Sequence, residues 1–345
     1  MTKKNSSERP HVGTKPQRGE GPLRVGLISL GCAKNLVDAE IMLGSLLKSG
    51  VEITNDSAQA DAVIVNTCSF IDSAQEESVD TILESVELRE AANRGQAVIV
   101  SGCLPQRFRD ELPKLLPEVD AFMGIDQVEQ VGDIVSQAVA NRAGRIGSQK
   151  SEARSQKQKV VGRLNELGEN HAASEHEKEE PLRGTDKFGR TRTVVAAPRQ
   201  SAAISANNSA ALFRDAATRH EPLLEVNSRP TFIPDFSTPR FRLTPKHFAY
   251  LKIAEGCNHP CSFCIIPRMR GSHRSRTQSD IVADAKALIA DGVKEINLIS
   301  QDSTYYGLDL RPNHSRAISS PEKFSAAAKS LAADATTICT LLREL

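Results

Sequence analysis

With 345 residues, the chain is long enough for two domains and a linker. Its 44 Lys and Arg residues nearly balance its 43 Asp and Glu residues, so bulk charge gives no strong nucleic-acid signal. The N-terminus is basic without an apolar signal region, and no stretch has the length of a membrane span. We therefore expect a cytoplasmic protein whose seven cysteines are reduced and serve as ligands or catalysts.

The first part of the chain alternates between apolar strands and amphipathic helices. Residues 1–22 are expected to form a disordered tail, and the first domain is expected to span 23–142. Strands are predicted at 24–30, 61–68, 96–103 and 121–124, and helices at 37–50, 72–94, 105–116 and from Asp126, the expected N-cap, onward. This order predicts an α/β domain with a flavodoxin-like parallel sheet covered by helices on both faces.

Residues 143–228 have a different composition. They mix charges of both signs with runs of Ser, Ala and Gln, and they show little apolar periodicity. A structureless stretch of this length does not belong inside a compact domain. We therefore predict a disordered, low-complexity insertion between two domains. The alternative is a small helical subdomain around Val160–Leu167 and Ala210–Ala217.

A second domain is expected over 229–345. Its predicted elements are a strand at 248–257, a helix at 279–292 with Ser279 as N-cap, and a strand at 293–302. A strand, a helix and a strand in this order would open a second parallel architecture. The first of these strands runs directly into a group of cysteines.

That group consists of Cys257, Cys261 and Cys264, in the segment EGCNHPCSFCIIP. Three thiolates within eight residues can wrap one [4Fe-4S] cluster and leave its fourth iron without a protein ligand. The amino and carboxylate groups of S-adenosylmethionine (SAM) can chelate that iron, and an electron from the cluster can then cleave the sulfonium. The alternative is a structural zinc site with His259 as a fourth ligand, or three unrelated thiols.

Three further cysteines, Cys32, Cys68 and Cys103, follow one another at intervals of 36 and 35 residues, about one strand–helix repeat each. Each lies at or just beyond the carboxyl end of a predicted strand. Because these ends share one edge of a parallel sheet, the three thiols are expected to converge and to bind a second cluster. The alternative is three buried structural thiols. Cys339 has no partner pattern and is interpreted as an incidental thiol.

Both cysteine groups together resemble the methylthiotransferase family of radical SAM enzymes, over about 23–140 and 229–310. Three segments resemble the branch of that family that modifies a ribosomal protein: SLGCAKNLVDAE at 29–40, RLTPKHFAYLKIAEGCNHPCSFCIIPRMRGSHRSR at 242–276 and SQDSTYYGLDL at 300–310. The resemblance implies transfer of a methylthio group to the β-carbon of an aspartate in small ribosomal subunit protein S twelve. It also implies two [4Fe-4S] clusters, SAM, and an electron donor such as flavodoxin or ferredoxin.

The resemblance assigns roles to individual residues. Cys257, Cys261 and Cys264 would bind the radical SAM cluster, and Cys32, Cys68 and Cys103 the auxiliary one. Phe263 would pack near the adenine, and Gln301 and Asp302 would contact SAM or substrate. Four arginines could steer a carboxylate or an RNA-bound substrate, or could simply form a solvated loop: Arg268, Arg270, Arg274 and Arg276. No catalytic acid or base is assigned.

The second domain is short for this family, whose radical SAM domain is a partial TIM barrel of six units. Residues 249–345 leave room for about two strand–helix units, and no terminal β-domain follows. We therefore expect a C-terminally truncated radical SAM domain, with poor cluster binding and little turnover by this chain alone. The competing interpretations are a tRNA adenosine methylthiotransferase, a non-catalytic remnant, and a flavodoxin-like binding domain with a tail.

Overall fold

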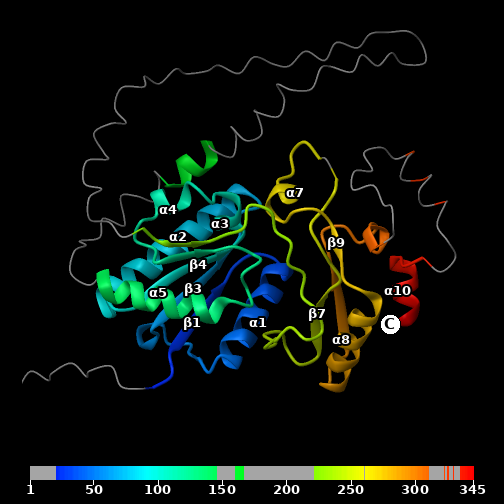
Figure 1. The fold of residues 1–345 in the computed structure, drawn as a ribbon, viewed down its shortest axis with the longest axis horizontal. Coiled ribbons are helices and arrows are strands. Elements are labelled where there is room, and N and C mark those ends of the chain that lie inside the picture. The colour runs from blue at the N-terminus through cyan, green and yellow to red at the C-terminus, as the bar shows by residue number, and fades with distance from the viewer. Residues whose placement is uncertain are drawn as a thin grey trace, which may run out of the picture.

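A computed structural model describes residues 21–145, 160–166, 221–259, 261–310, 322, 325, 329 and 335–345. These residues form two halves that lie side by side (Figure 1). The first half is built on a six-stranded sheet, and the second on a pair of parallel strands with one covering helix. Within the described ranges, no helix is long and apolar enough to cross a membrane.

The sheet of the first half is parallel throughout. Its strands are β1 (Arg24–Ser29), β2 (Glu52–Ile53), β3 (Ala62–Thr67), β4 (Ala97–Gly102), β5 (Ala121–Met123) and β6 (Leu223–Glu225). They lie in the order β2-β1-β3-β4-β5-β6. The first five strands have the order of a flavodoxin-like sheet, so the predicted fold class of this domain is confirmed. Strand β6 comes from the segment that sequence analysis assigned to the insertion.

Helices cover both faces of this sheet. They are α1 (Ala33–Lys48), α2 (Asp72–Ala92), α3 (Cys103–Arg107), α4 (Leu112–Leu115) and α5 (Val131–Arg145), with a short 3-10 turn at Ser57–Gln59. Apolar side chains of α1 and α5 pack on one face, and those of α2, α3 and α4 pack on the other. The single helix predicted at 105–116 is therefore two short helices. Pro113 fits the first turn of α4, where no N–H donor is needed.

Two other sequence-based expectations for the first half differ from the structure. Asp126 is not a helix N-cap, because α5 begins only at Val131. Its carboxylate instead accepts hydrogen bonds from the backbone N–H groups of Thr231 (2.8 Å) and Phe232 (3.1 Å), and so fixes the chain that leaves β6. Residues 160–166 are helical, and Val160 and Leu164 are buried in the first half's core. The other residues of the proposed helical subdomain, Ala210–Ala217, lie outside the described residues.

The second half opens with the strand–helix–strand unit that the sequence predicted. Its elements are β7 (Phe248–Lys252), β8 (Ala254–Glu255), α7 (Ile266–Met269), β9 (Arg274–Ser275), α8 (Gln278–Ala290), β10 (Glu295–Ile299), a 3-10 turn at Leu308–Leu310 and α10 (Ile338–Glu344). Strands β7 and β10 are parallel, and α8 connects and covers them. The N-cap of α8 is Thr277 rather than Ser279, because the Thr277 hydroxyl accepts the N–H of Asp280.

A segment that precedes β7 joins the two halves. The buried carboxylate of Glu40 on α1 accepts two hydrogen bonds from the Arg240 guanidinium, at 2.8 and 2.6 Å. It also accepts the backbone N–H groups of Leu243 (2.7 Å) and Thr244 (3.3 Å). The two halves are thus held together by specific polar contacts as well as by packing.

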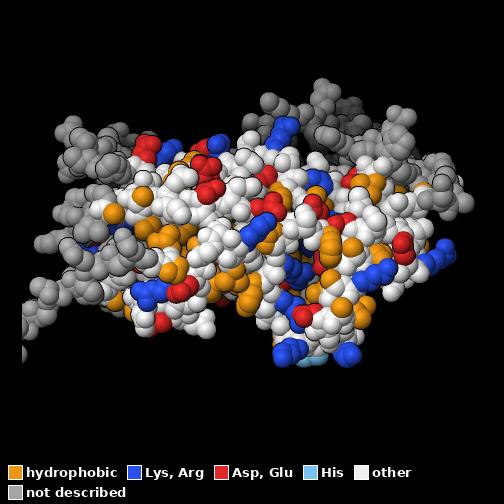
Figure 2. Space-filling model, turned by 60° about the horizontal axis from the view of Figure 1, so that its bottom comes forward, with side chains coloured by type: hydrophobic (Ala, Val, Ile, Leu, Met, Phe, Trp, Pro, Cys, Tyr) orange, Lys and Arg blue, Asp and Glu red, His pale blue; other side chains and the backbone are white. Residues whose placement is uncertain are grey.

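On the surface, acidic and basic side chains are interspersed over the face that Figure 2 presents, in keeping with the near-zero net charge.

Candidate iron–sulfur sites

The first group of cysteines lies at the carboxyl edge of the six-stranded sheet. Cys32 is the N-cap of α1, Cys68 follows β3 directly, and Cys103 is the first residue of α3 after β4. Strands β1, β3 and β4 are neighbours in the sheet, so the loops after them share one edge. Gly31 has a φ of 89°, and a Cβ there would lie 2.8 Å from the Cβ of Cys68. Glycine at this position therefore allows the Cys32 loop to approach Cys68.

Buried amide side chains tie these loops to one another. The Asn35 amide donates to the carbonyl oxygens of Leu30 (3.1 Å) and Thr67 (2.7 Å), and Asn66 donates to the carbonyl of Asn35 at 2.8 Å. Ser78 on α2 bonds both the N–H and the carbonyl of Cys68, at 3.1 and 2.9 Å. These contacts fix the backbone around the cysteines and do not involve their sulfur atoms.

The thiol of Cys103 is affected by burial, by Arg270 and by the other two thiols of its group. Burial raises the pKa of Cys103 to about 11; Arg270 opposes this shift, while Cys68 and Cys32 add to it. The sulfur of Cys103 lies 3.5 Å from the Asn35 side-chain oxygen, to which the thiol can donate. A free thiol in this environment is protonated at neutral pH. Iron binding would have to displace that proton, as metal ions do when thiolates coordinate them.

The second group of cysteines lies on one loop after β8. The N–H of Cys257 donates to the carbonyl of Gly271 (3.1 Å), and the N–H of Cys264 donates to the carbonyl of Cys261 (3.1 Å). Burial raises the pKa of Cys257, and its neighbours Asp302, Cys264 and Cys261 add to this, although the N–H of His259 opposes it. Cys261 is exposed, whereas the other two are half-buried. The loop is therefore more open than the first group.

Two observations bear on which metal these groups suit. Within the described ranges, no three His, Cys, Asp or Glu side chains are gathered closely enough to hold a single metal ion. His259, the candidate fourth zinc ligand, instead lies with its Nε2 2.8 Å from an Asp302 carboxylate oxygen. The thiolates of a four-iron cluster bind different irons, and so they lie farther apart than the ligands of one ion. Two groups of three neighbouring thiols therefore suit two [4Fe-4S] clusters better than zinc.

The other residues that the sequence singled out surround the second group. Phe263 is 88% exposed on the loop between Cys261 and Cys264. Gln301 donates to a carboxylate oxygen of Glu255 at 3.3 Å. Burial alone would raise the pKa of Asp302, but hydrogen bonds from Thr304 and the nearby His259 hold it below its ordinary value. Gln301 and Asp302 follow β10, and Asp302 contacts His259 of the cysteine loop. Cys339 is exposed on α10.

The basic run does not behave as one unit. Arg270 and Arg276 are buried, so neither belongs to a solvated loop or is free to steer a substrate. Arg276 forms ion pairs with Asp280 (2.6 Å) and Asp284 (3.0 Å) of α8. Arg268 and Arg274 line a cavity of about 640 Å³. The alternation of buried and accessible arginines was invisible in the sequence, because the carboxylates that bury two of them come from other elements.

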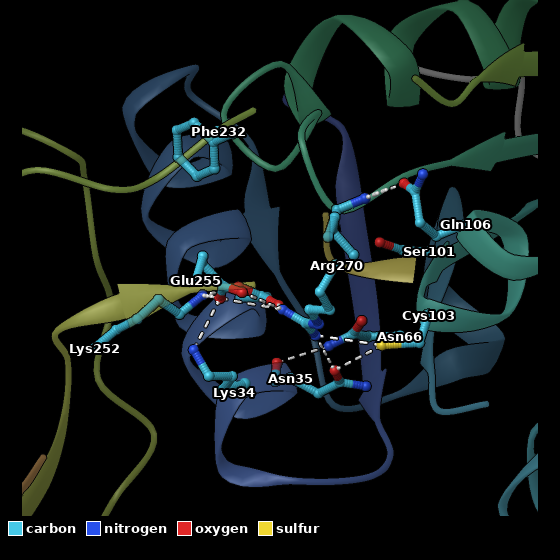
Figure 3. Close-up of polar contacts among 12 residues, drawn as sticks. Lys34, Asn35, Asn66, Ser101, Cys103, Gln106, Phe232, Lys252, Glu255 and Arg270 are labelled. Atoms are coloured by element: carbon cyan, nitrogen blue, oxygen red, sulfur yellow. Dashed lines mark hydrogen bonds and ion pairs between the residues drawn. The ribbon is translucent and has the colours of Figure 1, made fainter. Parts of the chain in front are cut away.

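Sequence analysis also missed a set of charged residues between the two halves. We call this set the buried ion-pair network, and its members are Lys34, Asp38, Lys252, Glu255 and Arg270. Figure 3 labels Lys34, Lys252, Glu255 and Arg270. Glu255 lies 3.3 Å from Lys34 and 2.7 Å from Lys252, and Lys252 also contacts Asp38. Charged residues inside a predicted buried helix and strand were the available signal, since such residues are buried only when paired.

Comparison with known proteins defines the class of each half. Residues 24–124 match the uncharacterized protein family UPF0004, and residues 251–332 match the radical SAM superfamily. The first half is thus similar to UPF0004 proteins, and the second to radical SAM proteins. Radical SAM proteins use SAM and a [4Fe-4S] cluster, which agrees with the cysteine loop at 257–264.

Several similar proteins carry one name. The chain is 41% identical over 305 residues to the ribosomal protein uS12 methylthiotransferase RimO of Akkermansia muciniphila, covering 87% of this chain and 50% of the relative. For the proteins of the same name from Opitutus terrae and Koribacter versatilis, the identities are 41% over 329 residues and 42% over 300 residues. They cover 94% and 87% of this chain, and 52% of each relative. The predicted resemblance is thus confirmed, and the chain spans about half the length of these relatives.

Proposed function

We propose that the protein containing this chain is a radical SAM methylthiotransferase that adds a methylthio group to the β-carbon of an aspartate in ribosomal protein uS12. The observation that supports this most is the presence of two separate three-cysteine groups at the junction of a UPF0004 domain and a radical SAM domain. One cluster would suffice for radical generation alone. A second three-ligand cluster is what the insertion of sulfur into an unactivated C–H bond would require.

Each half of the molecule would supply the three cysteine ligands of one cluster. Cys257, Cys261 and Cys264 would hold the radical SAM cluster, and Cys32, Cys68 and Cys103 the auxiliary cluster. When bound, the two clusters would supply one-electron cleavage of SAM and an iron site for the transferred sulfur. The protein's contribution is to exclude water from the auxiliary cluster site, where Cys68 and Cys103 are buried.

Residues around the cysteine loop would bind and orient SAM. The exposed ring of Phe263 is available to pack on the adenine, because an aromatic ring so accessible gains by stacking on a ligand. Asp302 is ionised next to the loop and can accept hydrogen bonds from hydroxyl or ammonium groups. The side-chain amide of Gln301 is oriented by its hydrogen bond to the Glu255 carboxylate.

The partners follow from this assignment. The relatives are named for uS12, and we propose the same substrate for this protein. Reduction of the clusters requires a small electron carrier, such as flavodoxin or ferredoxin. Ribosomal protein modification places the reaction in the cytoplasm. No residue of the described chain is proposed as a general acid or base, since the chemistry at the β-carbon proceeds by hydrogen-atom abstraction.

Mass analysis of a strain that lacks the gene tests this proposal. We expect the uS12 peptide to lose the mass that corresponds to replacement of one hydrogen by a methylthio group, and the tRNA adenosines to be unchanged. Complementation with the gene should restore the modification, whereas its Cys68→Ser variant should not. Loss of methylthio groups from tRNA with unchanged uS12 would identify the tRNA enzyme instead. No change in either would indicate a non-catalytic remnant.

A further inference from the structure

One member of the buried ion-pair network reaches from the second half into the first cysteine group. Arg270 follows α7, six residues after Cys264. Its Nη2 donates to the Cys103 sulfur at 3.3 Å and to the Asn35 side-chain oxygen at 2.6 Å. Figure 3 shows the guanidinium between Glu255 on one side and Asn35 with Cys103 on the other. A residue of the radical SAM half thus contacts a predicted ligand of the auxiliary cluster.

The position of Arg270 is fixed by two carboxylates. Its Nη1 lies 3.0 Å from Asp38 and 3.2 Å from Glu255, and the whole side chain is only 3% exposed. A guanidinium stays protonated in proteins. The buried side chain therefore carries a positive charge that these two carboxylates hold beside the sulfur.

The network also brings positive charge to the first cysteine group. It contains three basic side chains, Lys34, Lys252 and Arg270, and two carboxylates, Asp38 and Glu255. The guanidinium of Arg270 reaches the Cys103 sulfur. A cluster bound at Cys103 would therefore lie next to a buried positive charge.

We propose that Arg270 is a positioning residue that raises the reduction potential of the auxiliary cluster. This inference rests on the proposed function, since it assumes that Cys32, Cys68 and Cys103 hold that cluster. Reduction adds negative charge to the cluster, and both a hydrogen bond to a ligand sulfur and a nearby positive charge stabilise the reduced state. The same residue also couples the two halves, because its carboxylate partner Glu255 lies two positions before Cys257.

A purely structural role for Arg270 makes a different prediction. If the guanidinium only braced the two halves, its replacement would lower stability and leave the potential of any bound cluster unchanged. Arg276 offers a matched control: it is buried to the same degree, belongs to the same segment and pairs with two carboxylates. Its guanidinium donates to Asp280, Asp284 and the Lys252 carbonyl rather than to a cysteine.

The test uses the full chain with Cys257, Cys261 and Cys264 replaced by alanine, so that only the auxiliary cluster can form. Arg270→Gln, Arg270→Lys and Arg276→Gln are introduced into this background, and each protein is reconstituted anaerobically with iron and sulfide. Iron content is measured first. The midpoint potential is then determined by titration with reductant, followed by electron paramagnetic resonance of the reduced cluster.

We expect Arg270→Gln to shift the equilibrium about tenfold toward the oxidised cluster, which corresponds to about 59 mV lower potential for one electron. Arg270→Lys should shift it less in the same direction, because the charge remains but the fork that reaches both the sulfur and the carboxylates is lost. Arg276→Gln should leave it unchanged. If Arg270→Gln fails to retain a cluster, Arg270→Lys gives the result.

Two results would overturn the inference and leave the proposed function standing: an unchanged potential in every Arg270 variant that holds the cluster, or an equal shift in Arg276→Gln. A different result would overturn the proposed function itself. In that case the background protein, with Arg270 intact, would bind no iron and sulfide.

Discussion

The two cysteine groups are built in opposite ways. Cys32, Cys68 and Cys103 come from three strand ends of one sheet, whereas Cys257, Cys261 and Cys264 come from a single loop. In the first group Cys32 is exposed but Cys68 and Cys103 are buried, whereas the second group has no buried cysteine and includes the loop of the exposed Phe263. The first group therefore depends on the folding of a whole domain, and the second on the conformation of one loop that stays open to a ligand.

The largest effect should come from removing one cysteine of each group and measuring SAM binding. We expect Cys261→Ser to abolish the binding of labelled SAM to the reconstituted protein, because the open iron that chelates SAM is lost. Cys68→Ser should retain it, since that residue belongs to the other group. Equilibrium dialysis under anaerobic conditions measures both.

Cys339→Ser is the control for these variants, since Cys339 lies on α10 and belongs to neither group. It should bind SAM as the unmodified protein does. Equal loss of SAM binding in Cys68→Ser and Cys261→Ser would show that the two groups form one site, and the contrast between them would be wrong.

A second variant distorts the loop that begins at Cys257 without replacing a cysteine. Gly256 has a φ of 76°, and a Cβ there would lie 2.2 Å from the carbonyl oxygen of Ser272. Gly256→Ala should therefore displace the loop and weaken SAM binding at least about tenfold, since about 1.4 kcal/mol of strain gives that factor. The iron bound by the first group should remain.

Gly292→Ala separates steric conflict from backbone strain. Gly292 has a φ of 92°, but nothing lies within 4 Å of a Cβ built there. This variant should lose about 1 kcal/mol of stability, as expected for a non-glycine residue in the left-handed region, and bind SAM normally. Weakened SAM binding in both variants would mean that the close approach to Ser272 is unimportant.

A third variant acts on the contact between Glu40 and Arg240 that joins the two halves. Glu40→Gln would leave Arg240 without its buried counter-charge and weaken two backbone hydrogen bonds. We expect the free energy of unfolding of the metal-free chain to fall by about 3–5 kcal/mol. Glu166→Gln, which breaks the exposed pair with Arg163, should cost less than about 1 kcal/mol. Urea unfolding measures both free energies. Equal losses would show that the buried contact between Glu40 and Arg240 contributes no more to stability than an exposed ion pair.

The smallest effect concerns the pH dependence of the first half. Burial alone would raise the pKa of Glu90, but Arg89 and Arg142 outweigh it and hold the pKa below its ordinary value. A lowered pKa stabilises the folded state above the unfolded value of about 4.3, and this contribution disappears as pH falls through the folded pKa. The gap in unfolding free energy between the unmodified protein and Glu90→Gln should therefore shrink below about pH 4. Parallel pH profiles would contradict this.

Much of the frame that holds the first group could be predicted from the sequence. Apolar runs and helical periods marked β1, β3, β4 and their helices, and parallel topology then placed Cys32, Cys68 and Cys103 at one edge. The second group was evident from spacing alone. Both predictions rest on patterns within a few residues, namely apolar periodicity and cysteine spacing, which depend directly on the local geometry of strands, helices and loops.

The contacts between the halves could not be predicted, because each joins residues far apart in the chain. Lys252 pairs with Asp38 across 214 positions, and Arg240 pairs with Glu40 across 200. Strand β6 was missed because three residues inside a polar segment carry little pattern of their own. Asp126 was assigned to a helix start, since its true partners, such as Thr231, become neighbours only after folding.

The most direct test of the account is the iron and acid-labile sulfide content of the anaerobically reconstituted chain, with Mössbauer spectroscopy to identify the clusters. We predict four-iron clusters of two kinds, and an iron content that falls by about half when Cys32, Cys68 and Cys103 are replaced together. Zinc without sulfide, or an iron content that those three replacements leave unchanged, would contradict it.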